Sequence, residues 1–343
     1  MDLGKKTTAR VFSRAGLLGN PSDGYGGQAL ATTLYDFAAT VTVEPGDGFV
    51  IHPADQDGLR FPSLPAAAEA FEGGGCEDAV RLIRAATKRF FALAVDAGSG
   101  AVPAETGTRL RGGAHIRYET TIPRQVGCSG SSALIIAAIR ALAVYFDVPI
   151  EPFALSEAAL AAELEDLGIA AGPMDRVVQS YGGTMLMDLA APRRPENYQR
   201  IPTPLLPPLF LAWSPDRTKS SGALHGPLRR RWEQGDPEVT LVVEKLRALV
   251  DEGVAVLEAK DHVRFGELMT QNFALRLQIF PVTDADRSMV ELAASHGCPA
   301  KLAGSGGAIV GMIGEDTDPA ELERALRGFG ASYIRPTLEP PAA

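Results

Sequence analysis

The stretch Pro123-Arg-Gln-Val-Gly-Cys-Ser-Gly-Ser-Ser-Ala133 leads directly into an apolar run that ends at Phe146. This run predicts a buried helix beginning near Ser131. The first N–H groups of a helix are unpaired and positive, and glycines before them let the backbone approach an anion. Any one of these serines could instead cap the helix, but three serines and two glycines exceed what capping requires. We interpret the stretch as a triphosphate cradle with one hydroxyl on Mg²⁺, although it lacks the Walker A pattern.

A second glycine-rich segment, Arg14-Ala-Gly-Leu-Leu-Gly-Asn-Pro-Ser-Asp-Gly-Tyr-Gly-Gly27, follows a predicted strand at Ala9–Phe12. It can be a plain, turn-rich connection. Alternatively its backbone lies close to a small polar ligand, toward which Arg14, Asn20 and Asp23 project.

A third segment, Lys301-Leu-Ala-Gly-Ser-Gly-Gly-Ala308, precedes an apolar run to Ile313 that predicts a buried strand. A Gly-Ser-Gly-Gly cluster alone is more often a turn. Several phosphate-sized glycine loops in one chain favour a nucleotide ligand.

Acidic residues lie between these segments. Glu163 and Glu165 fall near the end of a predicted helix at 156–167, where such residues are ordinarily solvated surface charges. Asp175 follows a Gly-Pro turn and precedes an apolar helical start, where Asp is ordinarily an N-terminal cap.

The composition is that of a globular protein with a real core: 45% of the 343 residues are hydrophobic and the net charge is −9. An acidic chain is a poor candidate for binding nucleic acid or an anionic membrane. Three scattered cysteines (Cys76, Cys128 and Cys298) indicate neither a disulfide framework nor a zinc site. With no secretory signal at the start of the chain, we expect a cytoplasmic protein, monomer or homodimer, that acts on a small molecule.

The pattern of apolar residues predicts an α+β fold in two lobes, 1–195 and 196–343, separated by the proline-rich stretch 191–208, a stiff connector. In the helix at 156–167, Ser156 is the expected N-cap and Gly168 the expected stop. We predict strands at 39–43, 115–121, 209–214, 308–313 and 333–338 and helices at 77–95, 131–146, 156–167, 237–259, 261–279, 284–296 and 319–328.

Taken in order, the three glycine-rich segments resemble the motifs of the GHMP small-molecule kinases. Arg14 to Asp23 is similar to the family's first motif, Pro123 to Ala133 to its phosphate loop, and Gly304–Ala308 to its third, glycine-rich motif. The resemblance covers nearly the whole chain. It implies an N-terminal ribosomal-protein-S5-like domain, a C-terminal ferredoxin-like domain, and the use of ATP and Mg²⁺.

The resemblance also implies roles for individual residues. Asp175 matches the catalytic aspartate, and Arg14 takes the position of a catalytic Arg or Lys. Ser131 resembles the magnesium-ligating serine, and Glu163 precedes Asp175 by the twelve residues typical of a magnesium-ligating glutamate. ATP binding is implied for Pro123, Gly127, Ser129, Gly130, Ser131, Ser132, Gly304, Gly306 and Gly307. Substrate contacts are implied for Asn20, Asp23, Arg124 and Tyr181.

The segments LLGNPSDGYGG, IPRQVGCSGSSA, AGPMDRVVQSYGG and LRRRWEQGD resemble most the glucuronokinase branch of the family. This implies an ATP-dependent kinase for the 1-hydroxyl of D-glucuronate. Another sugar 1-kinase (for galacturonate, galactose or arabinose), a mevalonate-type kinase, or a non-catalytic sugar and ATP sensor are the alternatives. The phosphate loop is one residue longer than the family's common G-L-G-S-S, so Ser131 or Ser132 can be the metal ligand. For a substrate carboxylate, Arg124, Arg176 and the run 229–231 are candidate partners, or else surface charges.

Overall fold

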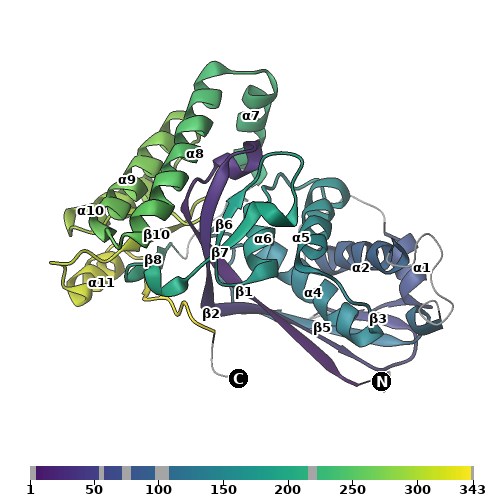
Figure 1. Cartoon of the computed structure of the whole chain (residues 1–343). Coiled ribbons are helices and arrows are strands. Elements are labelled where there is room, and N and C mark those ends of the chain that lie inside the picture. Colours follow the sequence, from purple (N-terminus) through teal and green to yellow (C-terminus); the bar gives the residue numbers. More distant parts are fainter. Residues whose placement is uncertain (1–4, 54–57, 72–78, 97–107, 215–221, 341–343) are drawn as a thin grey trace. The chain divides into compact units, whose positions relative to one another are not determined.

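The computed structural model describes residues 5–53, 58–71, 79–96, 108–214 and 222–340 (Figure 1). The chain forms two compact units that interleave along the sequence. The first unit comprises Met1–Phe12, Phe37–Ile122 and Gly130–Ala171; the second comprises Ser13–Asp36, Pro123–Ser129 and Gly172–Ala343. Both units combine strands and helices, which confirms the predicted α+β class. The predicted division at residue 195 stays a prediction.

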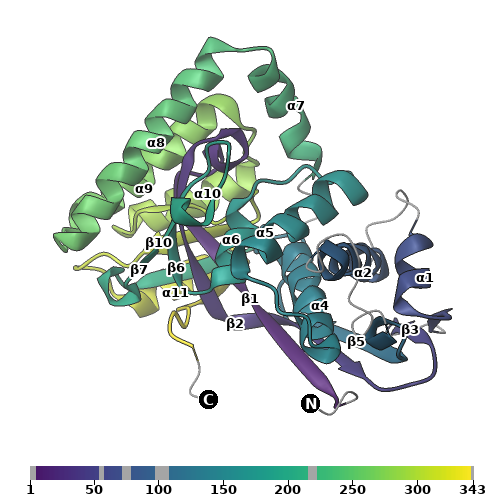
Figure 2. The same cartoon turned by 45° about the vertical axis from the view of Figure 1, so that its right-hand side comes forward.

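The first unit pairs short strands with a set of helices. Strand β5 (Ala114–Thr120) pairs in parallel with β3 (Phe49–His52) and antiparallel with Ala39–Glu44 of the long strand β2 (Gln28–Glu44). Its helices are α1 (Leu64–Glu69), α2 (Ala79–Asp96), α4 (Gly130–Phe146) and α5 (Pro152–Ala161), and β4 (Leu59–Phe61) pairs with β3. Helix α2 lies against α4, as Figures 1 and 2 show.

Helix α4 is the helix predicted from the apolar run after the phosphate-loop motif. It begins at Gly130, one residue before the predicted start, and most of its side chains are buried. A helix that is apolar on all sides must be enclosed by other elements, and α2 and α5 both pack against it.

The helix predicted at 156–167 differs from the structure in its start and in its final turn. Helix α5 begins at Pro152, because proline at the first helical position has the required φ and no N–H to lose. Ser156 is therefore inside the helix, where its hydroxyl donates to the Phe153 carbonyl, and is not an N-cap. The last turn, η2 (Ala162–Asp166), is π-helical. Gly168 follows with a φ of +65°, consistent with the predicted stop.

The second unit contains a four-stranded antiparallel sheet in the order β11-β8-β10-β9. In sequence its elements run strand, helices, strand, strand, helix, strand, the pattern of a ferredoxin-like fold. The strands are β8 (Leu209–Trp213), β9 (Ala300–Leu302), β10 (Ala308–Met312) and β11 (Ser332–Ile334). The helices are α7 (Gly222–Glu233), α8 (Pro237–Glu258), α9 (His262–Ile279), α10 (Asp284–Ser295) and α11 (Pro319–Gly328).

Apolar side chains from this sheet and from α9, α10 and α11 form one core that includes Phe210, Met289 and Leu322. Helices α8 and α9 run side by side (Figure 2). The strand predicted at 333–338 ends at Ile334, because Pro336 has no N–H for a sheet ladder; Thr337 instead bonds to Tyr35 and Asp36.

The first glycine-rich motif begins on strand β1 (Thr7–Leu18), whose residues up to Phe12 belong to the first unit and whose residues from Ser13 belong to the second. Strand β1 extends beyond the predicted Phe12, so Arg14 lies on a strand and not in a loop. Strand β6 (Thr184–Asp188) pairs with the start of β2 and with β7 (Tyr198–Ile201). The proline-rich stretch is thus more than a connector, since β7 lies within it.

Candidate active site

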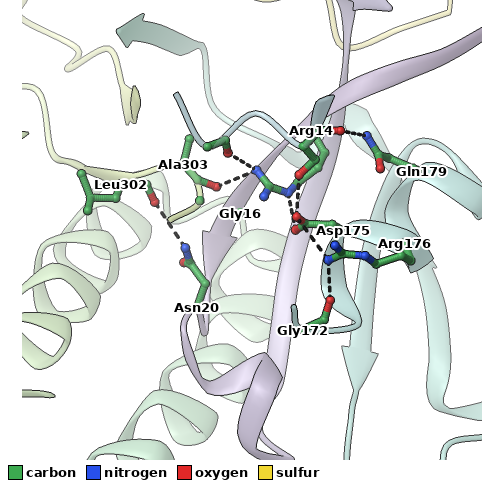
Figure 3. A network of polar contacts seen from close by, with 12 residues as sticks. Arg14, Gly16, Asn20, Gly172, Asp175, Arg176, Gln179, Leu302 and Ala303 are labelled. Atoms are coloured by element: carbon green, nitrogen blue, oxygen red, sulfur yellow. Dashed lines mark hydrogen bonds and ion pairs between the residues drawn. The ribbon is translucent and has the colours of Figure 1, made fainter. Parts of the chain in front are cut away.

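Asp175 lies in the first turn of α6 (Met174–Tyr181), and its carboxylate does not cap that helix. Arg14 Nε donates to Oδ1 at 2.5 Å, and the Ser129 hydroxyl donates to Oδ2 at 2.6 Å. Arg176 Nη1 lies 3.6 Å from Oδ2 (Figure 3). The Asp175 side chain keeps 17% of its surface exposed, so a carboxylate that is held on both oxygens still faces solvent on one side.

Arg14 connects all three glycine-rich segments. Its Nη1 donates to the carbonyl oxygens of Gly127, at 2.7 Å, and Ala303, at 3.1 Å (Figure 3). Burial alone would lower the pKa of this guanidinium, but the charge of Asp175 and the hydrogen bond to it raise that pKa above its ordinary value. Arg14 is therefore a permanent, almost fully buried cation fixed beside Asp175.

The phosphate-loop motif and the third motif touch through their backbones. A Cβ on Gly304 would lie 2.2 Å from the Gly127 carbonyl oxygen, and a Cβ on Gly127 would lie 2.8 Å from that of Gly306. Gly127 and Gly306 also have positive φ angles, of +73° and +128°. Glycine is needed here both for conformation and for close approach.

Ser129 has a positive φ of +61°, which is uncommon for a residue with a side chain. Gln179 Nε2 donates to its carbonyl oxygen at 3.0 Å and helps to hold this conformation. The sequence predicts Ser129 as an ATP contact; the structure adds that its hydroxyl binds the candidate catalytic carboxylate. Such strained residues are frequent at functional sites.

Asp23 lies in the turn η1 (Ser22–Tyr25) and packs against Gly172, where a Cβ would approach its Oδ2 to 2.0 Å. Burial, and then the negative charge of Asp175, raise the pKa of Asp23 to about 6. Its neighbour Asn20 is buried, and its amide oxygen accepts from Lys301 while its amide nitrogen donates to the Leu302 carbonyl oxygen. Asn20 is a predicted substrate contact, but both its amide oxygen and its amide nitrogen form hydrogen bonds within the protein.

Three buried charged residues were not predicted. Lys301 Nζ donates to the carbonyl oxygens of Gly16 and Leu302 as well as to Asn20, and burial lowers its pKa well below the ordinary value. Arg276 stacks on Phe280 and donates to the carbonyl oxygens of Gly304 and Ser305. Asp286 accepts from the Gly307 N–H at 2.9 Å. These residues hold the third glycine-rich loop.

A signal in the sequence could have pointed to one of these residues, Lys301. Lys301 heads the third glycine-rich segment, directly before an apolar strand, where a charge requires a buried partner.

The remaining predicted residues lie in different places. Arg124 is exposed and Pro123 is half-buried in the loop before α4. The ring of Tyr181 packs edge-on against Tyr198, with centroids 5.7 Å apart. The predicted roles of these three residues stay predictions.

The predicted magnesium ligands both belong to the first unit. Ser131 is exposed in the first turn of α4 and Ser132 is buried, while Glu163 is a buried carboxylate on the π-helical turn η2. Among the described residues, no group of three or more His, Cys, Asp or Glu could enclose a metal ion. Mg²⁺ ordinarily takes one or two protein carboxylates together with substrate phosphates. The oxygen donors Glu163 and Ser131 fit that chemistry.

The chain matches two family descriptions: "GHMP kinases N terminal domain" over residues 82–183 and "GHMP kinases C terminal" over residues 254–332. It is also 35% identical, over 91% of its length and 86% of the relative's, to glucuronokinase 1 of Arabidopsis thaliana. The chain belongs to the GHMP kinase family. It is therefore a phosphotransferase with an alcohol group as acceptor.

Other relatives agree with this assignment. Probable glucuronokinase 2 of Arabidopsis thaliana is likewise 35% identical over 91% of the chain and 86% of that protein. The solved structure of Lactococcus lactis galactokinase with galactose has a TM-score of 0.76 and 14% identity, and the match covers 98% of this chain and 94% of that one. The galactokinase likeness shows the shared fold. In the part of the chain that the structure describes, no helix combines the length and apolarity needed to cross a bilayer.

Proposed function

We propose that this kinase transfers the γ-phosphoryl group of ATP to the 1-hydroxyl of D-glucuronate, giving D-glucuronate 1-phosphate and ADP. The identity to two Arabidopsis proteins named as glucuronokinases supports the choice of sugar. The observation that carries the chemistry is the Asp175 carboxylate, which is fixed by Arg14 and Ser129 and still partly exposed.

In the proposed reaction Asp175 accepts the proton of the 1-hydroxyl as the sugar oxygen bonds to the γ-phosphorus. The bond from that phosphorus to the β–γ bridging oxygen breaks, and ADP leaves. An anomeric hydroxyl is more acidic than an ordinary alcohol, so a carboxylate is a sufficient base. Arg14 orients Asp175 and places a positive charge beside the transferring group.

The glycine-rich loops are the proposed ATP contacts. Phosphoryl transfer depends mainly on positioning and on neutralising phosphate charge. In this proposal, backbone N–H groups of the loop 127–132 and of residues 304–306 supply hydrogen-bond donors for the phosphates. Mg²⁺, when bound, neutralises charge on the β- and γ-phosphate oxygens, and we propose Ser131 and Glu163 as its protein ligands.

Release of ADP with Mg²⁺ and ATP, measured across glucuronate, galacturonate, galactose, glucose, arabinose and mevalonate, tests the substrate. We expect turnover with glucuronate, and a product whose sugar H-1 couples to ³¹P in NMR. Turnover with a neutral sugar or mevalonate alone, or phosphate on another hydroxyl, would refute the assignment. ATP binding without turnover on any compound would favour a sensor.

The role of Asp175 is tested by Asp175→Asn, which keeps the shape of the side chain and removes the base. We expect kcat to fall about 10²–10⁴-fold, with little change in the KM for ATP. A variant that is folded by circular dichroism and keeps near-normal kcat would exclude Asp175 as the base.

A further inference from the structure

Basic side chains are buried close to acidic groups in the second unit. Among the described residues of this unit, the buried basic side chains are Arg14, Arg176, Arg276 and Lys301, all at most 5% exposed. The acidic groups near them are Asp175, Asp23 and Asp286. A guanidinium is the strongest side-chain partner for a carboxylate in a water-poor site, so an arginine at the edge of the proposed sugar site is suited to a ligand that brings a negative charge.

Arg176, like Arg14, lies close to both acidic groups of the proposed sugar site. Its Nη1 donates to the Gly172 carbonyl oxygen at 2.7 Å and lies 3.6 Å from Asp175 Oδ2 (Figure 3). Gly172 in turn contacts Asp23. Burial, together with the positive charge of Arg14, lowers the pKa of Arg176 to about 9. An anion beside this guanidinium would relieve that penalty.

We propose that Arg176 is a specificity-determining residue that binds the carboxylate of an acidic sugar substrate. The proposal rests on the function proposed above and answers which cation recognises the acid. In a pyranose uronate, carbons 1 and 5 both bond to the ring oxygen, so the 1-hydroxyl and the carboxylate lie along one edge of the ring. Adjacent residues, Asp175 for the hydroxyl and Arg176 for the carboxylate, match that edge.

Three of the other arginines named from the sequence are less suited to this role. Arg124 and Arg230 are exposed, where water screens a charge pair and weakens it. Arg231 already binds Asp236 and Glu238, at 2.7 and 2.6 Å. A planar guanidinium in a water-poor site is the strongest partner for a carboxylate, because it can form two parallel hydrogen bonds.

A role in orienting Asp175 alone would have a different signature from a role in binding the carboxylate. If Arg176 only positions the base, its loss lowers the turnover of every substrate by the same factor. If it binds the carboxylate, its loss lowers kcat/KM for an acidic sugar much more than for the neutral sugar of the same configuration. The ratio of the two kcat/KM values therefore separates these roles.

The experiment compares the wild-type chain with Arg176→Gln and Arg176→Lys on two matched pairs, glucuronate with glucose and galacturonate with galactose. Binding of glucuronate and of its neutral amide is measured by calorimetry, so that weak turnover does not hide the result. We expect Arg176→Gln to reduce the acid-to-neutral ratio about 10²-fold, and Arg176→Lys to restore part of it. Arg324→Gln, on the exposed face of α11, is the matched control and should keep the wild-type ratio.

Two results would overturn the proposal for Arg176. One is an unchanged acid-to-neutral ratio in a folded Arg176→Gln variant, whatever the loss in rate. The other is a loss of the ratio in Arg124→Gln instead. A wild-type chain that neither binds nor phosphorylates a uronate would refute the proposed function itself, and the panel shows this before any variant is made.

Discussion

Gly304→Ala is the sharpest perturbation that the structure offers, because it acts where two glycine-rich loops meet. The added methyl group would lie 2.2 Å from the Gly127 carbonyl oxygen and 2.8 Å from Arg14 Nη2. Ordinary contacts to a Cβ begin at 3.4 Å, so the two loops must separate by roughly 1 Å. Neither neighbour can move freely, because one is backbone and the other is a buried side chain bonded to Asp175.

The expected loss in stability follows from these contacts. Overpacking a dense site costs about 1–3 kcal/mol. Displacing the Gly127 carbonyl oxygen from Arg14, now 2.7 Å away, weakens a charged hydrogen bond worth about 1.5–3 kcal/mol. We therefore expect the free energy of unfolding to fall by about 2–5 kcal/mol. Since the same shift moves Arg14 from Asp175, kcat should fall at least about 10-fold in the molecules that remain folded.

Urea denaturation followed by circular dichroism measures the stability, and ADP release under conditions where the variant is folded measures kcat. Gly328→Ala is the matched control, because a Cβ there meets no atom within 4 Å. Gly328 ends α11, where alanine is the better helix former, so this variant should be as stable as the wild type or slightly more so. A Gly304→Ala variant with wild-type stability and kcat would refute the close contact of the two loops.

Two further predictions concern buried acids. Asp166→Ala should lower the free energy of unfolding by about 2–3 kcal/mol, because it removes charged hydrogen bonds that Lys88 and Arg89 donate to a buried carboxylate. Glu165→Ala, which removes an exposed partner of Arg89, should lower it by at most about 1 kcal/mol in the same urea titration; equal losses would contradict the argument. For Asp23, a pKa raised to about 6 means that the folded chain holds this proton more tightly than the unfolded chain. Its contribution to stability is present at low pH and is lost as the pH rises through 6. Between pH 5 and 7.5 the wild type should therefore lose about 1 kcal/mol more stability than Asp23→Asn, and parallel pH profiles would exclude the shift.

The sequence predicts the local features of this chain because they depend on neighbouring residues. The apolar run after Ser131 can only be a buried helix, and Pro237, Asp261 and Asp284 mark helix starts that the structure places within one residue. Ser156 was wrong as a cap because Pro152, four residues earlier, is the stronger start signal. Short strands such as β3 and β9 were missed, since three or four residues carry little periodicity.

Long-range features could not be predicted in the same way. Arg14 and Asp175 form their ion pair across 161 residues of sequence, and no local sequence pattern around either residue predicts the other as its partner. The π-helical turn η2 is a similar case. Its last residue, Asp166, binds Lys88 and Arg89 of α2, and these partners lie far away in the chain. Resemblance to a family supplied the predicted catalytic roles of Arg14 and Asp175, and physical patterns did not.

The buried cations show why the glycine-rich loops need more than glycine. Glycine gives these loops the freedom to approach a ligand, and the same freedom must be removed before they can position one. Arg14, Arg276 and Lys301 do this by donating to backbone carbonyl oxygens of the loops or of the strands beside them. Because Arg14 and Arg276 are charged donors, they also place positive charge beside the proposed phosphate contacts. Rigidity of the loops and attraction for anionic ligands therefore arise from the same residues, so a neutral replacement at any of these positions should weaken both.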